Sequence, residues 1–209
     1  MKLYGLTGGI ASGKSTVSTM FETFGASIID ADKLSREVVE PGQPALELIA
    51  KRWPDCVIDG KLNRVRLGSQ VFKSVTQLQE LEAIIHPAIQ EEMHKRVLAL
   101  EAGGKKLAIY DAALIFEKGL EKDLEGVILV VASRETQIYR MHKRDGLTEA
   151  EARQRIEAQL PLSEKKNKAQ FIIDTDVPID QTRKQVSQVW EHLNGGREQT
   201  WKNTQSTKS

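Results

Sequence analysis

Residues 3 to 16 read Leu-Tyr-Gly-Leu-Thr-Gly-Gly-Ile-Ala-Ser-Gly-Lys-Ser-Thr, and this stretch sets the organisation of the whole chain. The apolar run at 3–6 predicts a buried strand. Gly8 to Ser15 match the pattern G-x-x-x-x-G-K-[ST] at every fixed position, and helical spacing of apolar residues begins at Val17. A strand, a glycine-rich turn and a helix in this order are the context in which the pattern indicates a phosphate-binding loop.

The residue types of this loop suit a nucleoside triphosphate. Its glycines let the backbone turn tightly and bring N–H groups close to an anion, and the start of the following helix adds N–H groups and a partial positive charge. Lys14 can reach the terminal phosphates, and the Ser15 hydroxyl can ligate Mg²⁺. The motif predicts nucleotide binding but does not say what is done with the nucleotide.

Composition excludes several classes of protein. The formal net charge of +1 over 209 residues gives no general affinity for nucleic acid or for an anionic membrane. The single cysteine, Cys56, excludes an internal disulfide and disfavours a Cys/His zinc site, so we expect it to be buried and unreactive. No secretion signal and no apolar run of about 20 residues is present, which favours a cytoplasmic location. The oligomeric state is not indicated.

Five short apolar runs alternate with helical patterns along the chain. This alternation predicts an α/β fold with a five-stranded parallel sheet flanked by helices. The expected strands are residues 3–6, 26–29, 107–110, 127–131 and 171–173.

The helical stretch at about 33–102 is longer than a crossover between strands needs, so we expect a helical insert that binds substrate. We expect residues 1–194 to form one nucleotide-binding unit with three parts. These are a core at about 1–32, 103–133 and 169–194, the insert at about 33–102, and a helical lid at about 134–168. Beyond this unit we expect a disordered polar tail at 195–209.

Local signals fix several turns and helix ends. Asp59-Gly60 predicts a hairpin with a type I′ turn. Thr76 with Gln79, and Thr148 with Glu151, predict capping boxes, and Ser133 predicts a helix N-cap. His86-Pro87 predicts a helix break followed by a new start.

Acidic residues follow two of the expected strands. Asp30 and Asp32 end the second strand and Asp111 ends the third, at the sheet edge where open parallel sheets bind ligands. Asp32 suits a base that takes a proton from an attacking hydroxyl, although helix N-capping explains it equally well. Asp111 resembles an acid that holds Mg²⁺, directly or through water, and strand-end solvation is the alternative.

Positive charge gathers on the helix expected after the fourth strand. Arg140 and Arg144 are four residues apart and share a helix face, so a lid could bring Arg140 over a triphosphate. A solvated basic face is the alternative.

His86 could donate to a substrate phosphate or cap a helix, and spacing favours the cap. A guanine-reading acid is missing beside Asn167, which disfavours a GTP-hydrolysing switch.

Taken together, several stretches of the chain resemble the dephospho-coenzyme A kinase family. They run in family order over nearly the whole chain, and the Asp-Ala-Asp, His-Pro and Arg-Asp-Gly set is far more selective than the phosphate loop alone. The matching stretches are Leu-Thr-Gly-Gly-Ile-Ala-Ser-Gly-Lys-Ser at 6–15, Ile-Asp-Ala-Asp at 29–32, Val-Val-Glu-Pro-Gly at 38–42, Asp-Gly-Lys-Leu-Asn-Arg at 59–64, Ile-His-Pro at 85–87, Leu-Ile-Phe-Glu at 114–117, Arg-Asp-Gly at 144–146, Ala-Arg-Gln-Arg-Ile at 152–156 and Gln159.

The resemblance implies transfer of the ATP γ-phosphate to the ribose 3′-hydroxyl of dephospho-coenzyme A, with ATP and Mg²⁺, in the last step of coenzyme A synthesis. It assigns Asp32 as the catalytic base, Arg140 as the lid arginine, and Arg64 and His86 to substrate binding. The ATP loop that it implies comprises Gly8, Gly9, Ile10, Ala11, Ser12, Gly13, Lys14, Ser15 and Thr16, and the metal positions are Ser15 and Asp111.

Two positions depart from the family pattern. Ala113 stands where a proline is usual after the third strand, and Asp174-Thr175-Asp176 replaces the usual Asn and Gly after the fifth.

Rival interpretations are another small-molecule kinase, acting on a nucleoside, a nucleotide or shikimate, and a nucleotide-binding module with negligible turnover. Assaying acceptors and products would separate them.

Overall fold

The structure is a computed structural model that describes residues 1–195. The expected polar tail therefore lies outside the described residues, apart from Gly195. The chain divides into two compact units, the first formed by Met1–Ile28 with the chain from Gly104 onward, and the second by Ile29–Gly103. Each unit has its own core and is described separately below.

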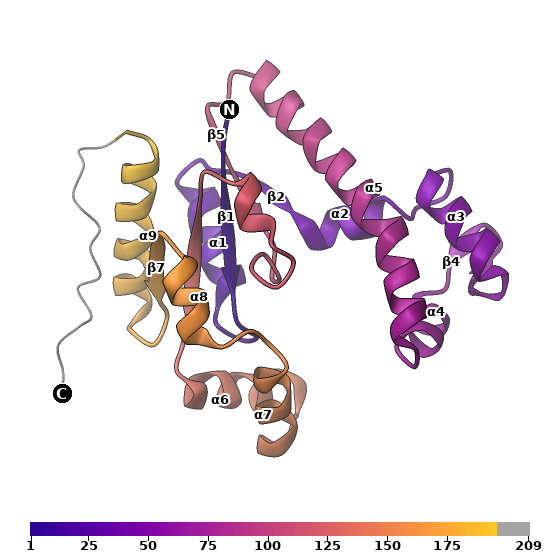
Figure 1. The fold of residues 1–209 in the computed structure, drawn as a ribbon. Coiled ribbons are helices and arrows are strands. Elements are labelled where there is room, and N and C mark those ends of the chain that lie inside the picture. The colour runs from indigo at the N-terminus through magenta and orange to yellow at the C-terminus, as the bar shows by residue number, and fades with distance from the viewer. Residues whose placement is uncertain (196–209) are drawn as a thin grey trace. The chain divides into compact units, whose positions relative to one another are not determined.

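The expected parallel sheet is confirmed. Its strands lie in the order β2 (Ser27–Asp30), β5 (Leu107–Asp111), β1 (Lys2–Gly8), β6 (Gly126–Val131) and β7 (Phe171–Asp174) (Figure 1). β1 pairs in parallel with β5 and β6, and β6 pairs in parallel with β7. Every residue of β5 and β6 is buried, which explains why these strands read as continuous apolar runs.

The core of the first unit lies between the sheet and two helices. α1 (Lys14–Thr23) and α9 (Ile179–Leu193) pack against each other, α1 contacts β1, and α9 contacts β7. Val17 and Phe21 of α1 and Val186 and Val189 of α9 are fully buried in this core. The apolar spacing after the phosphate loop therefore fixes α1 to the sheet and, with it, the loop.

The segment between β6 and β7 forms three helices, α6 (Arg134–Asp145), α7 (Glu149–Glu157) and α8 (Leu162–Lys168). The expected Ser133 cap and the Thr148–Glu151 capping box are confirmed. α8 was not expected, because six of its seven residues are polar and the segment, with Leu162 alone apolar, shows no apolar periodicity. We call residues 134–168 the lid segment.

The second unit consists of helices and the small hairpin. It contains α2 (Ala31–Glu37), α3 (Pro44–Arg52), η1 (Pro54–Cys56), β3 (Val57–Ile58), β4 (Lys61–Leu62), α4 (Arg64–Val71) and α5 (Val75–Ala102). Asp59 and Gly60 both have positive φ, at 49° and 72°, as a type I′ turn requires. Trp53 and Cys56 are buried in its core, so the expected burial of Cys56 is confirmed, and this burial raises the pKa of the thiol.

Two expectations about α5 are wrong. The helix runs from Val75 to Ala102 without a break and contains Pro87. Because proline has no backbone N–H, it removes one hydrogen bond of the helix, and the other 27 residues maintain the helical structure around it. Its N-cap is Ser74, whose hydroxyl accepts from the Gln77 N–H at 3.4 Å, and not Thr76. His86 therefore lies in the helix interior and does not cap a helix.

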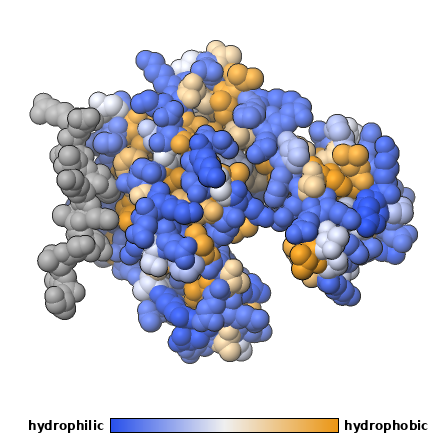
Figure 2. Space-filling view, viewed as in Figure 1, coloured by the Kyte–Doolittle hydropathy of each residue, from blue (hydrophilic) through white to orange (hydrophobic). Residues whose placement is uncertain are grey.

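The surface of the second unit is partly apolar around α4. Figure 2 shows apolar side chains reaching the surface there, and Val65 and Phe72 are 85% and 77% exposed. In both units, no helix among residues 1–195 has the length and apolar character to cross a membrane.

Candidate active site

The phosphate loop connects β1 to α1 with two residues in the left-handed region. Gly13 has φ 88° and stands at the N-cap of α1, and Ala11 has φ 55°. A side chain at position 13 would also lie 3.2 Å from the Arg140 guanidinium, so the position needs glycine for space as well as for φ. The Ser12 N–H donates to Gly9 O at 3.0 Å and closes the turn.

Three consecutive carbonyls of the loop accept hydrogen bonds from side chains outside it. The pairs are Ile10 O with Gln137 Nε2 at 2.6 Å, Ala11 O with Arg140 Nη1 at 3.1 Å, and Ser12 O with Thr175 Oγ1 at 2.6 Å. A trans peptide directs its N–H opposite to its C=O, and none of the described peptide bonds is cis. The N–H groups of residues 11–13 are therefore directed away from these side chains. The Ser12 N–H donates to Gly9 O, and those of Ala11 and Gly13 face the side that an anion would occupy.

Thr175 is a member of the site that the sequence did not reveal as such. Its hydroxyl contacts both Ser12 O and the Arg140 Nη1 atom, at 2.6 Å and 2.9 Å, and its carbonyl accepts from Arg140 Nη2 at 2.9 Å. The only signal was its position just after β7, where the chain departs from the family pattern. Thr175 links the loop to the arginine of α6.

Asp111 lies beside the loop, as its position at the end of β5 predicts. Its buried carboxylate, 7% exposed, forms an ion pair with Lys14 Nζ. The Ser15 hydroxyl is on the exposed first turn of α1. A nucleotide that took Lys14 to its phosphates would free the Asp111 carboxylate for other partners.

Ser15 and Asp111 fit Mg²⁺ only together with a nucleotide. Among residues 1–195, no group of three or more His, Cys, Asp or Glu side chains could hold a metal. Ser15 and Asp111 supply one hydroxyl and one carboxylate. Magnesium is commonly bound by one or two carboxylates plus substrate phosphates and water, so these two residues suit it.

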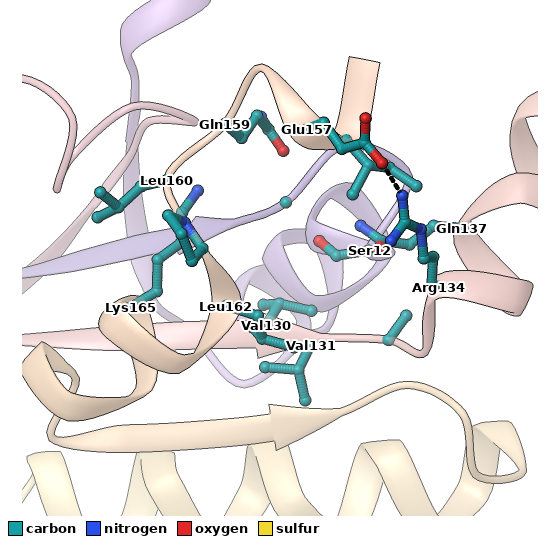
Figure 3. A pocket seen from close by; sticks show the side chains of 14 residues that line it. Ser12, Val130, Val131, Arg134, Gln137, Glu157, Gln159, Leu160, Leu162 and Lys165 are labelled. Carbon is teal, nitrogen blue, oxygen red and sulfur yellow. Dashed lines mark hydrogen bonds and ion pairs between the residues drawn. The ribbon is translucent and has the colours of Figure 1, made fainter. Parts of the chain in front are cut away.

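A cavity of about 310 Å³ lies behind the loop, between β6 and the lid segment (Figure 3). Lys165 lines it and is 2% exposed, with Nζ 2.5 Å from Glu117 Oε1 in an ion pair that lacks hydrogen-bond geometry. Within the described chain, Lys165 Nζ and Ser12 Oγ make no hydrogen bond. The cavity therefore holds two buried polar groups with unused hydrogen-bonding capacity.

Two further arginines of the lid segment have carboxylate partners. Arg134 pairs with Glu157, and both line the cavity (Figure 3), whereas Arg144 pairs with the adjacent Asp145 at 2.8 Å. The pKa of Arg144 is raised, first by its hydrogen bond to Asp145. Of Arg140 and Arg144, which the sequence placed on one helix face, the structure brings only Arg140 to the loop.

Asp176 supports the start of α6. It accepts a hydrogen bond from the Ser133 N–H at 2.5 Å. Desolvation alone would raise its pKa, but hydrogen bonds from Thr136 and Ser133, with the charge of Arg140, outweigh that effect and lower it. This carboxylate therefore stays ionised where the chain enters the lid segment.

In the second unit, Asp30 and Asp32 have different roles at the start of α2. Asp30 is the N-cap, because its carboxylate accepts from the N–H groups of Asp32 and Lys33 at 2.8 Å and 3.1 Å. Asp32 lies inside the first turn and is exposed. Capping, which the sequence offered as the alternative for Asp32, is thus carried out by Asp30.

Arg64 and His86 also belong to the second unit and are exposed. Arg64 starts α4, and its Nη2 atom donates to Arg36 O at 3.3 Å. His86 lies in the middle of α5. Their assignment to substrate binding stays a prediction.

The family model described as dephospho-CoA kinase matches residues 2–181. A dephospho-CoA kinase of Syntrophotalea carbinolica is 43% identical over 188 residues, which is 89% of each chain. Among solved structures, a Thermus thermophilus protein is 30% identical with a TM-score of 0.82, over 92% of this chain and 97% of that one. Dephospho-CoA kinase from Campylobacter jejuni is 28% identical with a TM-score of 0.72, and the match covers 94% of this chain and 99% of that one.

Proposed function

We propose, because the chain belongs to the dephospho-CoA kinase family, that it transfers the γ-phosphate of ATP to the ribose 3′-hydroxyl of dephospho-coenzyme A. The family resemblance read from the sequence is thereby confirmed. The observation that carries the proposal is the phosphate loop, in which the carbonyls of residues 10–12 are turned toward side chains of the lid segment and of the chain after β7. The family match over residues 2–181 supplies the acceptor.

Lys14 and the loop N–H groups bind the β- and γ-phosphates in this proposal. Lys14 exchanges its Asp111 partner for phosphate oxygens, which costs little because one anion replaces another. Phosphoryl transfer depends mainly on positioning of the phosphates and on charge neutralisation. A loop that is already held in shape supplies the positioning.

Ser15 would hold Mg²⁺, with Asp111 as a direct or water-mediated ligand, and the ion would supply charge neutralisation at the phosphates when bound. Asp111 suits this role because it is buried beside Lys14 and because its carboxylate becomes available when Lys14 turns to the nucleotide.

Asp32 takes the proton of the acceptor hydroxyl. Support comes from the local structure of α2, where Asp30 provides the cap and leaves the Asp32 carboxylate exposed for substrate. A carboxylate base in this position contributes through proton transfer as the acceptor oxygen attacks. Arg64 and His86 contact the acceptor elsewhere in the same unit.

Arg140 neutralises charge that develops on the transferred phosphoryl group. Its guanidinium contacts the loop at Ala11 O, and movement of the lid segment would bring it from there to the phosphate oxygens. Closure of the lid segment over the nucleotide would also exclude water and so prevent wasteful hydrolysis.

An acceptor panel tests the function. Purified protein with Mg²⁺ and ATP is assayed for ADP formation with dephospho-coenzyme A, shikimate, nucleosides and nucleotides. We expect turnover with dephospho-coenzyme A at least about a hundredfold above any other acceptor, because a bulky acceptor contributes binding energy that smaller ones lack. Equal turnover with shikimate or a nucleoside would contradict the assignment, and nucleotide binding without any product would favour a binding module.

A further inference from the structure

Two glutamine amides hold Ile10 of the phosphate loop from one side. Its carbonyl accepts from Gln137 Nε2 at 2.6 Å, and its N–H donates to Gln159 Oε1 at 2.8 Å. A Cβ atom at Gly9 would lie 2.9 Å and 3.4 Å from the same two amide atoms, so both approach the loop from the same side. The Ala11 N–H faces the other side, where an anion would lie. The two glutamines therefore fix the peptide that carries this N–H and the peptide before it.

The two glutamines belong to different parts of the lid segment. Gln137 is on α6, whereas Gln159 lies in the connection at 158–161 between α7 and α8. Movement of α6 over a nucleotide would change the Gln137 contact. A constant support for Ile10 therefore depends on what holds the connection at 158–161.

Glu117 fixes this connection to the core. Its Oε1 atom accepts from the Leu160 N–H at 3.3 Å and lies 2.5 Å from Lys165 Nζ. Glu117 stands between β5 and β6, outside the lid segment, and Lys165 is on α8. Lys165, Leu160 and Gln159 all line the cavity (Figure 3). One carboxylate oxygen thus joins both α8 and the connection before it to the core.

Burial makes this arrangement depend on the charge of Lys165. Its side chain is 2% exposed, and that of Glu117 is 19% exposed. Within the described chain, Glu117 Oε2 makes no hydrogen bond, so the contacts of Oε1 are what keep the carboxylate in place. A buried ion without its partner is strongly unfavourable. Without the Lys165 charge, Glu117 would turn toward water and release the Leu160 N–H.

A second ion pair of α8 differs from the first in its exposure. Lys168 Nζ lies 3.3 Å from Glu121 Oε1, and the Lys168 side chain is 45% exposed. Glu121 is in η2 (Leu120–Asp123). Exposed pairs of this kind contribute little, because water and salt screen them. The buried pair of Lys165 is therefore the one expected to hold α8 and the connection before it.

We propose that Lys165 is a positioning residue for the phosphate loop. Through Glu117 it fixes the connection at 158–161, and through Gln159 this connection fixes Ile10. α8 then stays with the core, and the moving part of the lid segment consists of α6 and α7. The inference rests on the proposed function for its nucleotide and for the moving lid, but concerns a residue that the proposed reaction does not use.

Calorimetric titration with Mg²⁺ and the β,γ-imido analogue of ATP tests the proposal, with the melting temperature measured in parallel. Lys165→Met keeps the length of the side chain and removes its charge. We expect the Kd to rise about two- to tenfold, the size of the one hydrogen bond that is loosened at Ile10. A merely structural role would lower the melting temperature and leave the Kd unchanged, and that result would overturn the inference.

Lys168→Met is the matched control, because it makes the same chemical change at the exposed ion pair of α8. Its Kd should stay within about twofold of the wild-type value. A rise equal to that of Lys165→Met would overturn the inference, because any attachment of α8 would then serve as well.

Gln159→Met tests the route from Lys165 to the loop. It removes the acceptor at Ile10 and leaves the buried ion pair intact, so it should raise the Kd by about the same factor as Lys165→Met. The double variant should show no further rise, because both changes interrupt one path. Additive effects, or an unchanged Kd in Gln159→Met, would overturn the inference.

A rescue variant tests the part played by Glu117. Glu117→Gln combined with Lys165→Met removes both buried charges but keeps an amide oxygen for the Leu160 N–H. This variant should fold even if Lys165→Met alone does not, and its Kd should return to within about twofold of wild type. A Kd that stays raised would overturn the inference. Because nucleotide binding is measured directly, a lack of turnover with dephospho-coenzyme A would contradict the proposed function alone.

Discussion

The phosphate loop and the acceptor-side residues differ in how firmly the fold holds them. In the loop, carbonyls 10 to 12 each accept a hydrogen bond from a side chain that lies far along the sequence. In the second unit, Asp32, Arg64 and His86 are exposed, and only Arg64 has a side-chain hydrogen bond described above. In the proposed reaction the protein therefore prearranges the nucleotide side, whereas the predicted acceptor side would rely on its substrate to complete it. Substitutions should therefore change nucleotide affinity on one side and turnover on the other.

The largest expected effect is that of Asp32→Ala. Removal of the base should lower kcat by roughly 10²- to 10⁴-fold, because that is the usual contribution of general-base catalysis. The Kd for ATP should stay within about twofold, since Asp32 holds no part of the loop. Steady-state kinetics and calorimetry measure the two quantities. Near-normal turnover would remove Asp32 from the role of base.

Arg140→Ala should lower both the affinity for ATP and kcat. It deletes the hydrogen bonds to Ala11 O and to Thr175, and charge-assisted bonds of this kind stabilise by about 1.5–3 kcal/mol each. We expect ATP to bind at least about tenfold more weakly and kcat to fall as well. Arg144→Ala is the matched control, because that arginine pairs with Asp145 and should leave the affinity for ATP unchanged. Equal effects of the two variants would contradict a special position for Arg140.

Thr175→Val tests whether the prearrangement depends on a single hydroxyl. The variant keeps the shape of the side chain but loses the bond to Ser12 O, so ATP should bind about two- to tenfold more weakly with kcat little changed. Thr175→Ser restores the hydroxyl and should restore the affinity. Failure of the serine variant to do so would show that the methyl group, and not the hydroxyl, is what matters.

The smallest expected effect concerns Asp176 and pH. Because the folded-state pKa of this carboxyl is lowered, its stabilising contribution is full above the ordinary aspartate value of about 3.9. The contribution is lost as pH falls from there through the folded-state pKa. Asp176→Asn should therefore lower the free energy of unfolding at pH 7, and its difference from wild type should shrink as the pH falls below about 3.9. Chemical denaturation at several pH values measures this, and a constant difference across the range would contradict it.

The parallel sheet and the loop could be predicted because their signals are local. The pattern from Gly8 to Ser15 specifies its own turn, and the apolar runs of β5 and β6 specify buried strands. Helix ends set by a cap within three residues, such as Ser133, were also predicted. Pro87 misled the prediction because a local breaker signal was overridden by a helix of 28 residues.

The supports of the loop could not be predicted in the same way. Thr175 and Ser12 are 163 residues apart, and Gln137 and Ile10 are 127 apart. Nothing in the immediate neighbourhood of Thr175 or Gln137 marks either side chain as a donor to a backbone carbonyl. Such contacts follow from the strand order, which places the ends of β1, β6 and β7 side by side.

The account depends on one reaction, and mass spectrometry observes it directly. Dephospho-coenzyme A is incubated with the protein, Mg²⁺ and ATP, and the products are separated and fragmented. The account predicts ATP-dependent conversion to coenzyme A with the new phosphate on the ribose 3′-oxygen. Unchanged dephospho-coenzyme A, or a phosphate at any other position, would contradict it.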